Sequence, residues 1–403
     1  MNHKEKLHIG FAKEEINTPL EVGYLTSSVR GTYASFEKKL SPLFARVIAF
    51  QSSEETIILI SLDLIGLSNE AVFGWERFKK AIGKHVDSNK IIVTCTHNHS
   101  SPESISLSSL SETEIYSKWL IELENTINKA ILESLKNLEQ ISRIKRRIGI
   151  LKKHSLQRRI KTEEGIRMSD CMQPIEEYLF DIQPIDNRNQ TIEFLNQSGK
   201  TIASIAHVIC HPVHEMLHPF ISPDFTGYLA EEMNHKKIFG FSLVVNGCCA
   251  DINPPTVSGG TNTAKKHAYA ILNCFLNPHS ILDVPFNSIN YRRKNIRISH
   301  RSNTSVLETS INYMKIGELG ITFLPGEIFI ATAQKIEQYS PKIHHIIVGF
   351  SENYIGYTPT KQAFIEGGYE VGPGKWSNLH IDTENILIDE SKRLHDLERI
   401  FNN

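Results

Sequence analysis

The stretch LFARVIAFQSSEETIILISLDLIGL, residues 43–67, decides the fold class of this 403-residue chain. It holds two apolar runs, 43–50 and 56–67, which the polar segment QSSEE at 51–55 separates. Short apolar runs on either side of a polar turn are typical of strands in a protein core. The sequence therefore predicts two buried strands joined by a turn.

The segments that follow alternate between helical and strand-like patterns. A helix is expected over 71–82 (AVFGWERFKKAI), and a strand over 90–97 (KIIVTCTH). A long amphipathic helix is predicted by apolar residues that recur every four positions, and Ser111 with Glu114 matches a capping box at its start. These apolar residues are Ile115, Trp119, Leu123, Ile127, Ile131 and Leu135.

The remainder of the chain continues this alternation. Residues 143–208 read mostly as strands, with a hairpin turn at Ser198 and Gly199, and a short helix is expected from Asp224. Further helices are expected at AKKHAYAILNCFL and IFIATAQKI, further strands at SLVVNG, 288–324 and HIIVGF, and a polar helix at the C-terminus. We find no internal repeat or linker. The sequence therefore predicts one large α/β catalytic domain, residues 1–403, in which mixed β-sheets pack with helices.

Composition excludes several classes of function. The chain is 40% hydrophobic and 22% charged, with a formal net charge of −1, which is ordinary for a globular protein and gives no overall attraction to nucleic acid. The basic strip at 142–154 is interpreted as the solvated face of a strand. No apolar stretch reaches the length of a membrane span, and no secretory signal is found. Six cysteines without a CxxC pair are typical of a reduced, cytoplasmic protein.

His97 and His99, in VTCTHNHSSP, are the most informative of the eighteen histidines. Residues two apart on a strand share a face and lie about 6.6 Å from each other. Two imidazoles in this arrangement can bind one zinc ion. Alternatively, one of them binds the metal while the other contacts the substrate.

Other candidates follow apolar strands. His211 closes the run IASIAHVICHP, His207 within that run is expected to be a core residue, and His214 and His218 in the loop beyond could be ligands or solvated. Glu327 in FLPGEIF is either a helix-terminal carboxylate or the carboxylate that hydrolytic zinc sites include beside histidines.

Asp63 and the segment NGCCADINPP contribute further polar candidates. Asp63 ends the apolar strand ILISLDL, where a carboxylate needs a partner, so we expect it to support a metal ligand. The segment NGCCADINPP brings Cys248, Cys249, Asp251 and Asn253 together. Adjacent cysteines could supply a nucleophile or ligands, but compact packing is the simpler interpretation. No GxSxG, P-loop or GxGxxG motif is present.

Several of these segments, taken in order, resemble the catalytic domain of the neutral/alkaline non-lysosomal ceramidase family. The resemblance runs through SPLFARVIAF, ISLDLIGL, THNHSSP, ICHP, ISPDFTGY, NGCCADINP, LPGE, ENYIGYTPT and GGYE. Members of this family are zinc amidases that cleave the N-acyl bond of ceramide. We find no counterpart of the family's C-terminal immunoglobulin-like domain.

The resemblance implies a role for individual residues. It implies zinc ligands at His97, His211, Glu327 and Tyr357, with His99 facing the substrate. Tyr369 and Arg158 resemble groups that hold the reacting carbonyl or its oxyanion. Asn253 stands where the family has a serine before proline; asparagine cannot act as such a nucleophile but can hydrogen-bond a substrate.

The sequence thus predicts a zinc-dependent hydrolase of an amide bond in an acyl substrate, small or lipid-like, with His99 protonating the leaving amine. Two alternatives remain. One is a zinc-assisted hydrolase or cyclase for an ester, a lactone or another small acyl metabolite. The other is a non-catalytic zinc-binding protein on a hydrolase scaffold.

Overall fold

The computed structural model describes residues 6–53, 55–302, 305–340 and 344–401; Glu54, in the predicted turn, lies outside them. The α-helices of these residues are α1 (Trp75–Ile82), α2 (Glu114–Lys136), α3 (Asp224–His235), α4 (Thr261–Leu276), α5 (Ile330–Gln338), α6 (Lys361–Glu366) and α7 (Thr383–Phe401). The main sheet is built from β1 (His8–Ile16), β5 (Leu43–Gln51), β6 (Thr56–Leu62), β7 (Ile91–Cys95), β8 (Glu139–Ile150), β12 (Arg188–Asn196), β13 (Thr201–Val208), β15 (Phe241–Asn246), β17 (Ser280–Val284), β18 (Ile289–Ser299), β19 (Val306–Ile316), β20 (Leu319–Pro325) and β22 (His344–Ser351). Short strands outside it are β2 (Tyr24–Ser27), β3 (Thr32–Ala34), β4 (Lys38–Lys39), β9 (Leu156–Gln157), β10 (Arg159–Thr162), β11 (Gly165–Met168), β14 (Phe220–Ile221), β16 (Ile252–Asn253), β21 (Glu327–Ile328) and β23 (Tyr357–Thr358).

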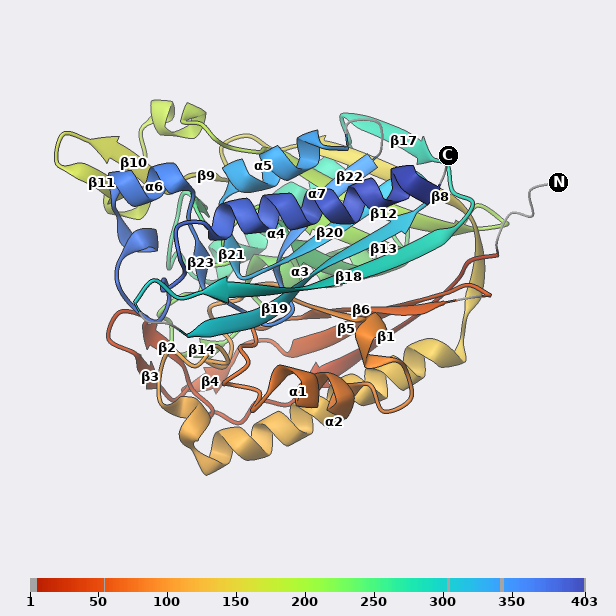
Figure 1. The fold of residues 1–403 in the computed structure, drawn as a ribbon, viewed down its shortest axis with the longest axis horizontal. Helices are drawn as coiled ribbons and strands as arrows, with labels where there is room; N and C mark the ends of the chain where they lie inside the picture. Colours follow the sequence, from red (N-terminus) through yellow and green to blue (C-terminus); the bar gives the residue numbers. More distant parts are fainter. Residues whose placement is uncertain (1–5, 54, 303–304, 341–343, 402–403) are drawn as a thin grey trace.

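The described strands form a 13-stranded mixed sheet in the order β15-β13-β12-β8-β1-β5-β6-β7-β22-β20-β19-β18, with β17 paired to β8 (Figure 1). Two of its strand pairings are short. β1 pairs with β8 through two residue pairs only, and β22 pairs with β7 through Ser351 and Thr94. The predicted strand pair is confirmed as the antiparallel β5 and β6, which lie at the centre of this order.

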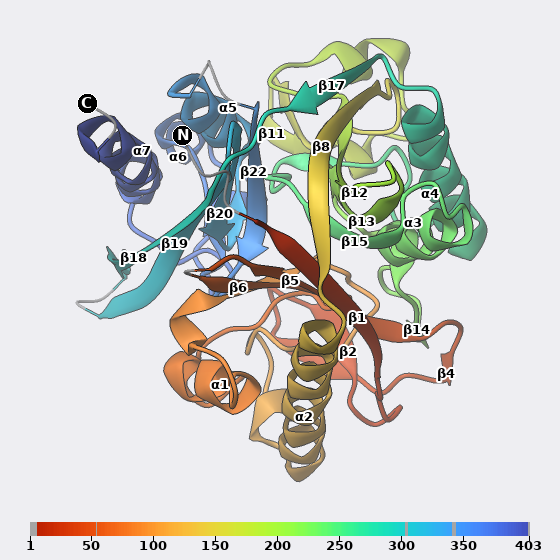
Figure 2. The same cartoon turned by 90° about the vertical axis from the view of Figure 1, so that its right-hand side faces the viewer.

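Both faces of the central strands are buried, which explains why their sequence is apolar at nearly every position. Ile48 and Phe50 of β5 face a core shared with strands from both ends of the sheet. Val47 and Ala49, which alternate with them, face α1 and α2. Figure 2 shows α1 and α2 below the central strands, α3 and α4 beside β13 and β15, and α5 and α7 beside β18 to β22. The predicted α/β architecture, one large domain with a mixed sheet and packed helices, is confirmed.

The predicted helix at 115–135 is confirmed as α2, but its predicted capping box is wrong. The N-cap is Thr113, whose hydroxyl accepts a hydrogen bond from the Tyr116 N–H. Ser111 lies in a preceding 3-10 helix, and its hydroxyl contacts the Ser106 hydroxyl. The extra turn before α2 therefore shifts the cap by two residues.

Two predictions for the β-rich middle of the chain have a mixed outcome. The hairpin is confirmed, since β12 and β13 are antiparallel and Gly199 turns with a φ of 79°. Residues 151–187, however, hold only short strands and 3-10 turns. The basic strip forms β8 as predicted, although Arg146 is buried and donates to Gln190. No helix in the described ranges is long and apolar enough to cross a membrane.

Candidate metal centre and acyl-substrate site

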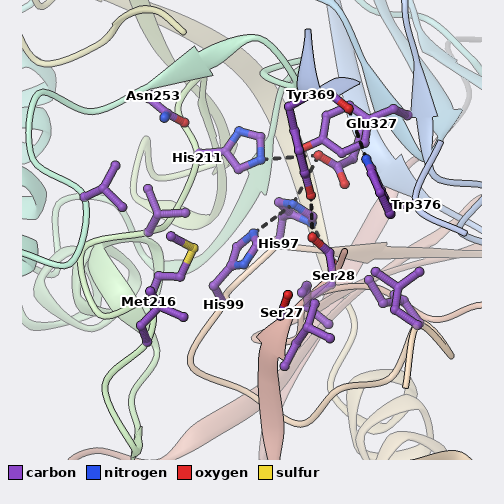
Figure 3. A pocket seen from close by; sticks show the side chains of 18 of the residues that line it. Ser27, Ser28, His97, His99, His211, Met216, Asn253, Glu327, Tyr369 and Trp376 are labelled. Carbon is purple, nitrogen blue, oxygen red and sulfur yellow. Dashed lines mark hydrogen bonds and ion pairs between the residues drawn. The ribbon is translucent and has the colours of Figure 1, made fainter. Parts of the chain in front are cut away.

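The predicted metal ligands come together at the ends of strands that are distant in sequence (Figure 3). His97 follows β7, and His211 follows β13, whereas Glu327 lies in β21, after β20. Tyr357 of β23 lies directly opposite Glu327, because β21 and β23 pair in parallel. Side chains that gather at strand ends in this way are typical of sites in α/β proteins.

His97 and His99 converge through a turn and not through the pleat of a strand, as we had expected from their spacing. β7 ends at Cys95, and His97 has a φ of 66°, a left-handed conformation that costs energy for a residue other than glycine. The N–H groups of His97 and Asn98 both donate to the Leu64 carbonyl, which holds this turn. The two imidazole rings lie 4.8 Å apart at 89°.

Two of the imidazoles are fixed by a backbone contact at Nδ1, which leaves Nε2 facing the space that the candidate ligands share. His97 Nδ1 lies 2.7 Å from the Ile65 carbonyl oxygen, and His211 Nδ1 lies 2.6 Å from the Cys249 carbonyl oxygen. A carbonyl oxygen only accepts, so Nδ1 carries a proton in each ring, and the neutral form of each ring has its lone pair at Nε2. Backbone contacts of this kind orient histidine ligands in metal sites.

Glu327 places one carboxylate oxygen between these two nitrogens. Its Oε2 lies 3.5 Å from His97 Nε2 and 3.3 Å from His211 Nε2, while the Tyr354 hydroxyl donates to Oε1 at 2.5 Å. Burial raises the pKa of Glu327, but the contacts with His97 and His211 outweigh it and hold the pKa well below its usual value. The carboxylate is therefore charged.

These distances fit a metal ion. Ligand atoms about 2.0–2.1 Å from a tetrahedral zinc lie about 3.3–3.4 Å from each other. The contacts of Glu327 Oε2 match this separation, and so does the 3.2 Å between His97 Nε2 and His99 Nε2. His211 Nε2 and Glu327 Oε2 are buried without a hydrogen-bond partner in the described chain.

The protonation states also suit metal binding, which requires neutral imidazoles. Burial lowers the pKa of His211 to about 4. Burial and the neighbouring His97 and His211 lower the pKa of His99 well below its usual value. The ligand atoms of His97, His99 and His211 lie within 4.8 Å of one another, so this group could hold a metal ion.

Arg158 and two tyrosines form the wall beside Glu327. Arg158 Nη2 donates to the Tyr357 hydroxyl at 3.0 Å, and its Nε donates to Glu370 at 2.9 Å. Burial raises the pKa of Tyr357 well above its usual value, and Arg158 opposes that rise. The Tyr369 hydroxyl lies 2.6 Å from the Ser28 hydroxyl and faces the same space.

A cavity of about 260 Å³ opens over these groups. All nine predicted site residues except Asp63 line it. Its apolar lining includes Leu25, Ile105, Leu107 and Met216. Pockets for drug-sized ligands span roughly 300–1,000 Å³, so this cavity suits a small group.

The remaining candidates lie away from the cavity. Asp63 pairs with Arg46 at 2.8 Å and accepts from the Phe44 N–H, so its expected support of a metal ligand stays a prediction. His207 bonds the Ile347 carbonyl inside the core, as expected. His214 contacts His267, and His218 contacts Glu215, and neither joins the three-histidine group.

The buried cysteines behave as packing residues. Burial raises the pKa of Cys248 and Cys249 above the usual thiol value, which disfavours the reactive thiolate. No cysteine lines the cavity in the described chain.

Three residues at the site were given no role by the sequence. Tyr354 binds Glu327, and Glu370 binds both Arg158 and Arg159. Both stand in motifs quoted above, ENYIGYTPT and GGYE, so the motif was a signal for them. Asp170, which lines the cavity, lies in a segment with no recognisable pattern.

Comparisons with known proteins bear on the fold. No protein-family model and no curated protein matches the sequence. Among solved structures, neutral ceramidase from Pseudomonas aeruginosa is similar with a TM-score of 0.75 and 15% identity, over 96% of this chain and 74% of that one. A ceramidase complexed with C2 is similar with a TM-score of 0.75 and 14% identity, over 97% and 76%. The likeness confirms the ceramidase-like fold that the sequence motifs predicted.

Proposed function

We propose that this protein is a zinc-dependent hydrolase that cleaves the amide bond of a small N-acyl substrate. The observation that carries the proposal is the convergence of His97 Nε2, His211 Nε2 and Glu327 Oε2 at ligand spacing in a cavity. Tyr357, opposite Glu327, would complete the ligand set. A bound zinc ion would supply a Lewis acid and the means to ionise water near neutral pH.

The other residues of the cavity would transfer a proton, stabilise the oxyanion and bind the substrate. His99 is the least buried of the three histidines and has no ion pair with Glu327 among the described contacts. It is therefore free to take a proton from the attacking water and to give it to the departing amine. Tyr369 and Arg158 present O–H and N–H donors to the same space, where they would stabilise a developing oxyanion. Asn253 offers its amide to the substrate.

The size of the cavity favours a small acyl group over a long-chain lipid. About 260 Å³ lies just below the range that drug-sized ligands occupy. Small esters would meet the same groups and are therefore included in the test.

The experiment combines metal analysis with a substrate panel. Purified protein is expected to carry about one zinc per chain and to hydrolyse short N-acyl amides, to lose activity with a chelator and to regain it with zinc. Preference for esters over amides would redirect the proposal, and hydrolysis by a zinc-free His97→Ala/His211→Ala variant would refute it.

A further inference from the structure

Two acceptor atoms on one wall of the cavity have no partner in the described chain. The Oδ1 atom of Asn253 and the Oδ1 atom of Asp170 are both buried, and no described group donates to either. The Asn253 side chain is only 3% exposed. Both residues line the cavity over the histidines. Buried acceptors are normally satisfied, so these two indicate a ligand that donates.

The backbone shows that these acceptors belong to one wall. β16, which ends at Asn253, pairs with β9. The Arg158 N–H donates to the Asp251 carbonyl, and the Ser169 N–H donates to the Arg158 carbonyl. Residues 169–170 and 251–253 therefore lie on either side of Arg158.

The other end of the cavity has a different character. Figure 3 shows Ser27 and Ser28 on the far side of the histidines from Asn253. Leu25, on the same strand as Ser27, lines that end together with Ile105 and Leu107. Apolar side chains thus line both ends, the β2 end adds the serine hydroxyls, and the acceptors that lack a donor lie at the Asn253 end.

We infer that the substrate is a small N-acyl amide with one arm that ends in a hydrogen-bond donor, held by Asn253 and Asp170. This inference rests on the proposed function. A carboxylate is acceptor-only, so Asp170 requires a hydroxyl or an ammonium group and repels an anionic arm. Asp170 and Asn253 would then select among substrates without taking part in bond cleavage.

The test compares four acetamides with matched arms: N-acetylputrescine, N-(4-hydroxybutyl)acetamide, N-butylacetamide and 4-acetamidobutanoate. A second series carries the same end groups on the acyl arm of N-methylamides. In at least one series, kcat/KM for the hydroxyl or ammonium compound is expected to exceed that for the methyl compound about tenfold, with the carboxylate compound the poorest.

Variants assign the preference to the two residues. Asn253→Leu should reduce the preference for both donors, and Asp170→Asn should reduce mainly that for the ammonium. Asp181→Asn, an exposed carboxylate outside the cavity, is the matched control and should change neither. Equal kcat/KM for all end groups in both series, or a preference that survives both variants, would overturn the inference.

Binding separates this inference from the proposed function. Calorimetric titration with the same compounds measures the preference without turnover. If the donor compounds bind best but none is cleaved, the role given to Asn253 and Asp170 stands and the hydrolase proposal fails. If the methyl compounds of both series are cleaved as well as the donor compounds and bind as tightly, the hydrolase proposal stands and the role given to Asn253 and Asp170 fails.

Discussion

Two buried polar clusters lie along the same strand, β7, and differ in how their polar atoms are satisfied. Beside the strand, Lys79 and Glu352 form an ion pair in which neither side chain is exposed. Lys79 also donates to the Ile91 carbonyl, and Glu352 accepts from the Val93 N–H, Trp75 and Ser310. Past the end of the strand, His211 Nε2 and Glu327 Oε2 have no hydrogen-bond partner in the described chain.

The difference separates a structural cluster from a binding site. Burying a polar group costs free energy unless a partner compensates for the lost water. In the Lys79 cluster, the charged groups of Lys79 and Glu352 find all their partners within the protein, and these contacts attach β7 to its neighbours. In the histidine cluster it leaves the partner to be supplied from outside. Both clusters bury charged groups, so burial alone does not distinguish them; the presence or absence of hydrogen-bond partners does.

Removing two ligands of the histidine cluster should have the largest effect. We expect His97→Ala/His211→Ala to lose zinc and to lower kcat/KM by more than the roughly 10³-fold that loss of one oxyanion donor costs. Zinc content and turnover measure this together. Retained zinc would place the metal elsewhere in the chain.

Removing His99 should separate catalysis from metal binding. His99→Ala is expected to keep zinc but to lower kcat by about 10²–10⁴-fold, the usual contribution of a general acid. Added imidazole should restore part of the rate. Loss of zinc in this variant would show that His99 is itself a ligand, as its position in the three-histidine group allows.

Breaking the Lys79 cluster should change stability and not metal binding. Lys79→Met leaves the buried Glu352 with only the more distant Arg293, 4.0 Å away, as a cation. Breaking a buried ion pair typically costs about 3–5 kcal/mol. A lower thermal unfolding midpoint with unchanged zinc content at 20 °C is expected. Lys118→Met is the control, since Lys118 pairs with Glu114 on an exposed helix face, and its midpoint should not change. Equal midpoints for both variants would contradict the contrast between the two regions.

The smallest effect concerns Tyr354, which contacts the proposed ligand Glu327. Tyr354→Phe removes the hydrogen bond to Glu327 Oε1 and should weaken zinc binding about 10–100-fold. Competition with a chelator measures the affinity. Tyr369→Phe is the matched control, because its hydroxyl contacts Ser28 and not Glu327; it should lower kcat at unchanged affinity.

The fold was predictable wherever local pattern determines structure. The apolar runs of β5 and β6 and the four-residue period of α2 depend on residues that are close in sequence. The capping-box pattern at Ser111 was misleading because a 3-10 helix, Leu110–Glu112, precedes α2 and places Thr113 at the cap. Segment 151–187 was misread as strands of the sheet because its short strands pair outside it: β10 pairs with β11, and β9 pairs with β16, about a hundred residues further along the chain.

The sequence predicted which residues form the candidate site but not how they are arranged in space. His97, His211 and Glu327 stand in short motifs, so their residue types were visible. The left-handed turn at His97 was not, since it is held by the Leu64 carbonyl, more than thirty residues away. Likewise, the contact of Tyr354 with Glu327 and the unsatisfied oxygen of Asp170 arise only when distant strands meet.

The most direct test of the metal centre is a crystal structure with anomalous diffraction measured at the zinc edge. One strong peak is expected about 2.0–2.2 Å from His97 Nε2, His211 Nε2 and Glu327 Oε2, with the Tyr357 hydroxyl as the fourth protein ligand. A zinc-soaked crystal with no peak there, or with its peak on other residues, would contradict this metal centre.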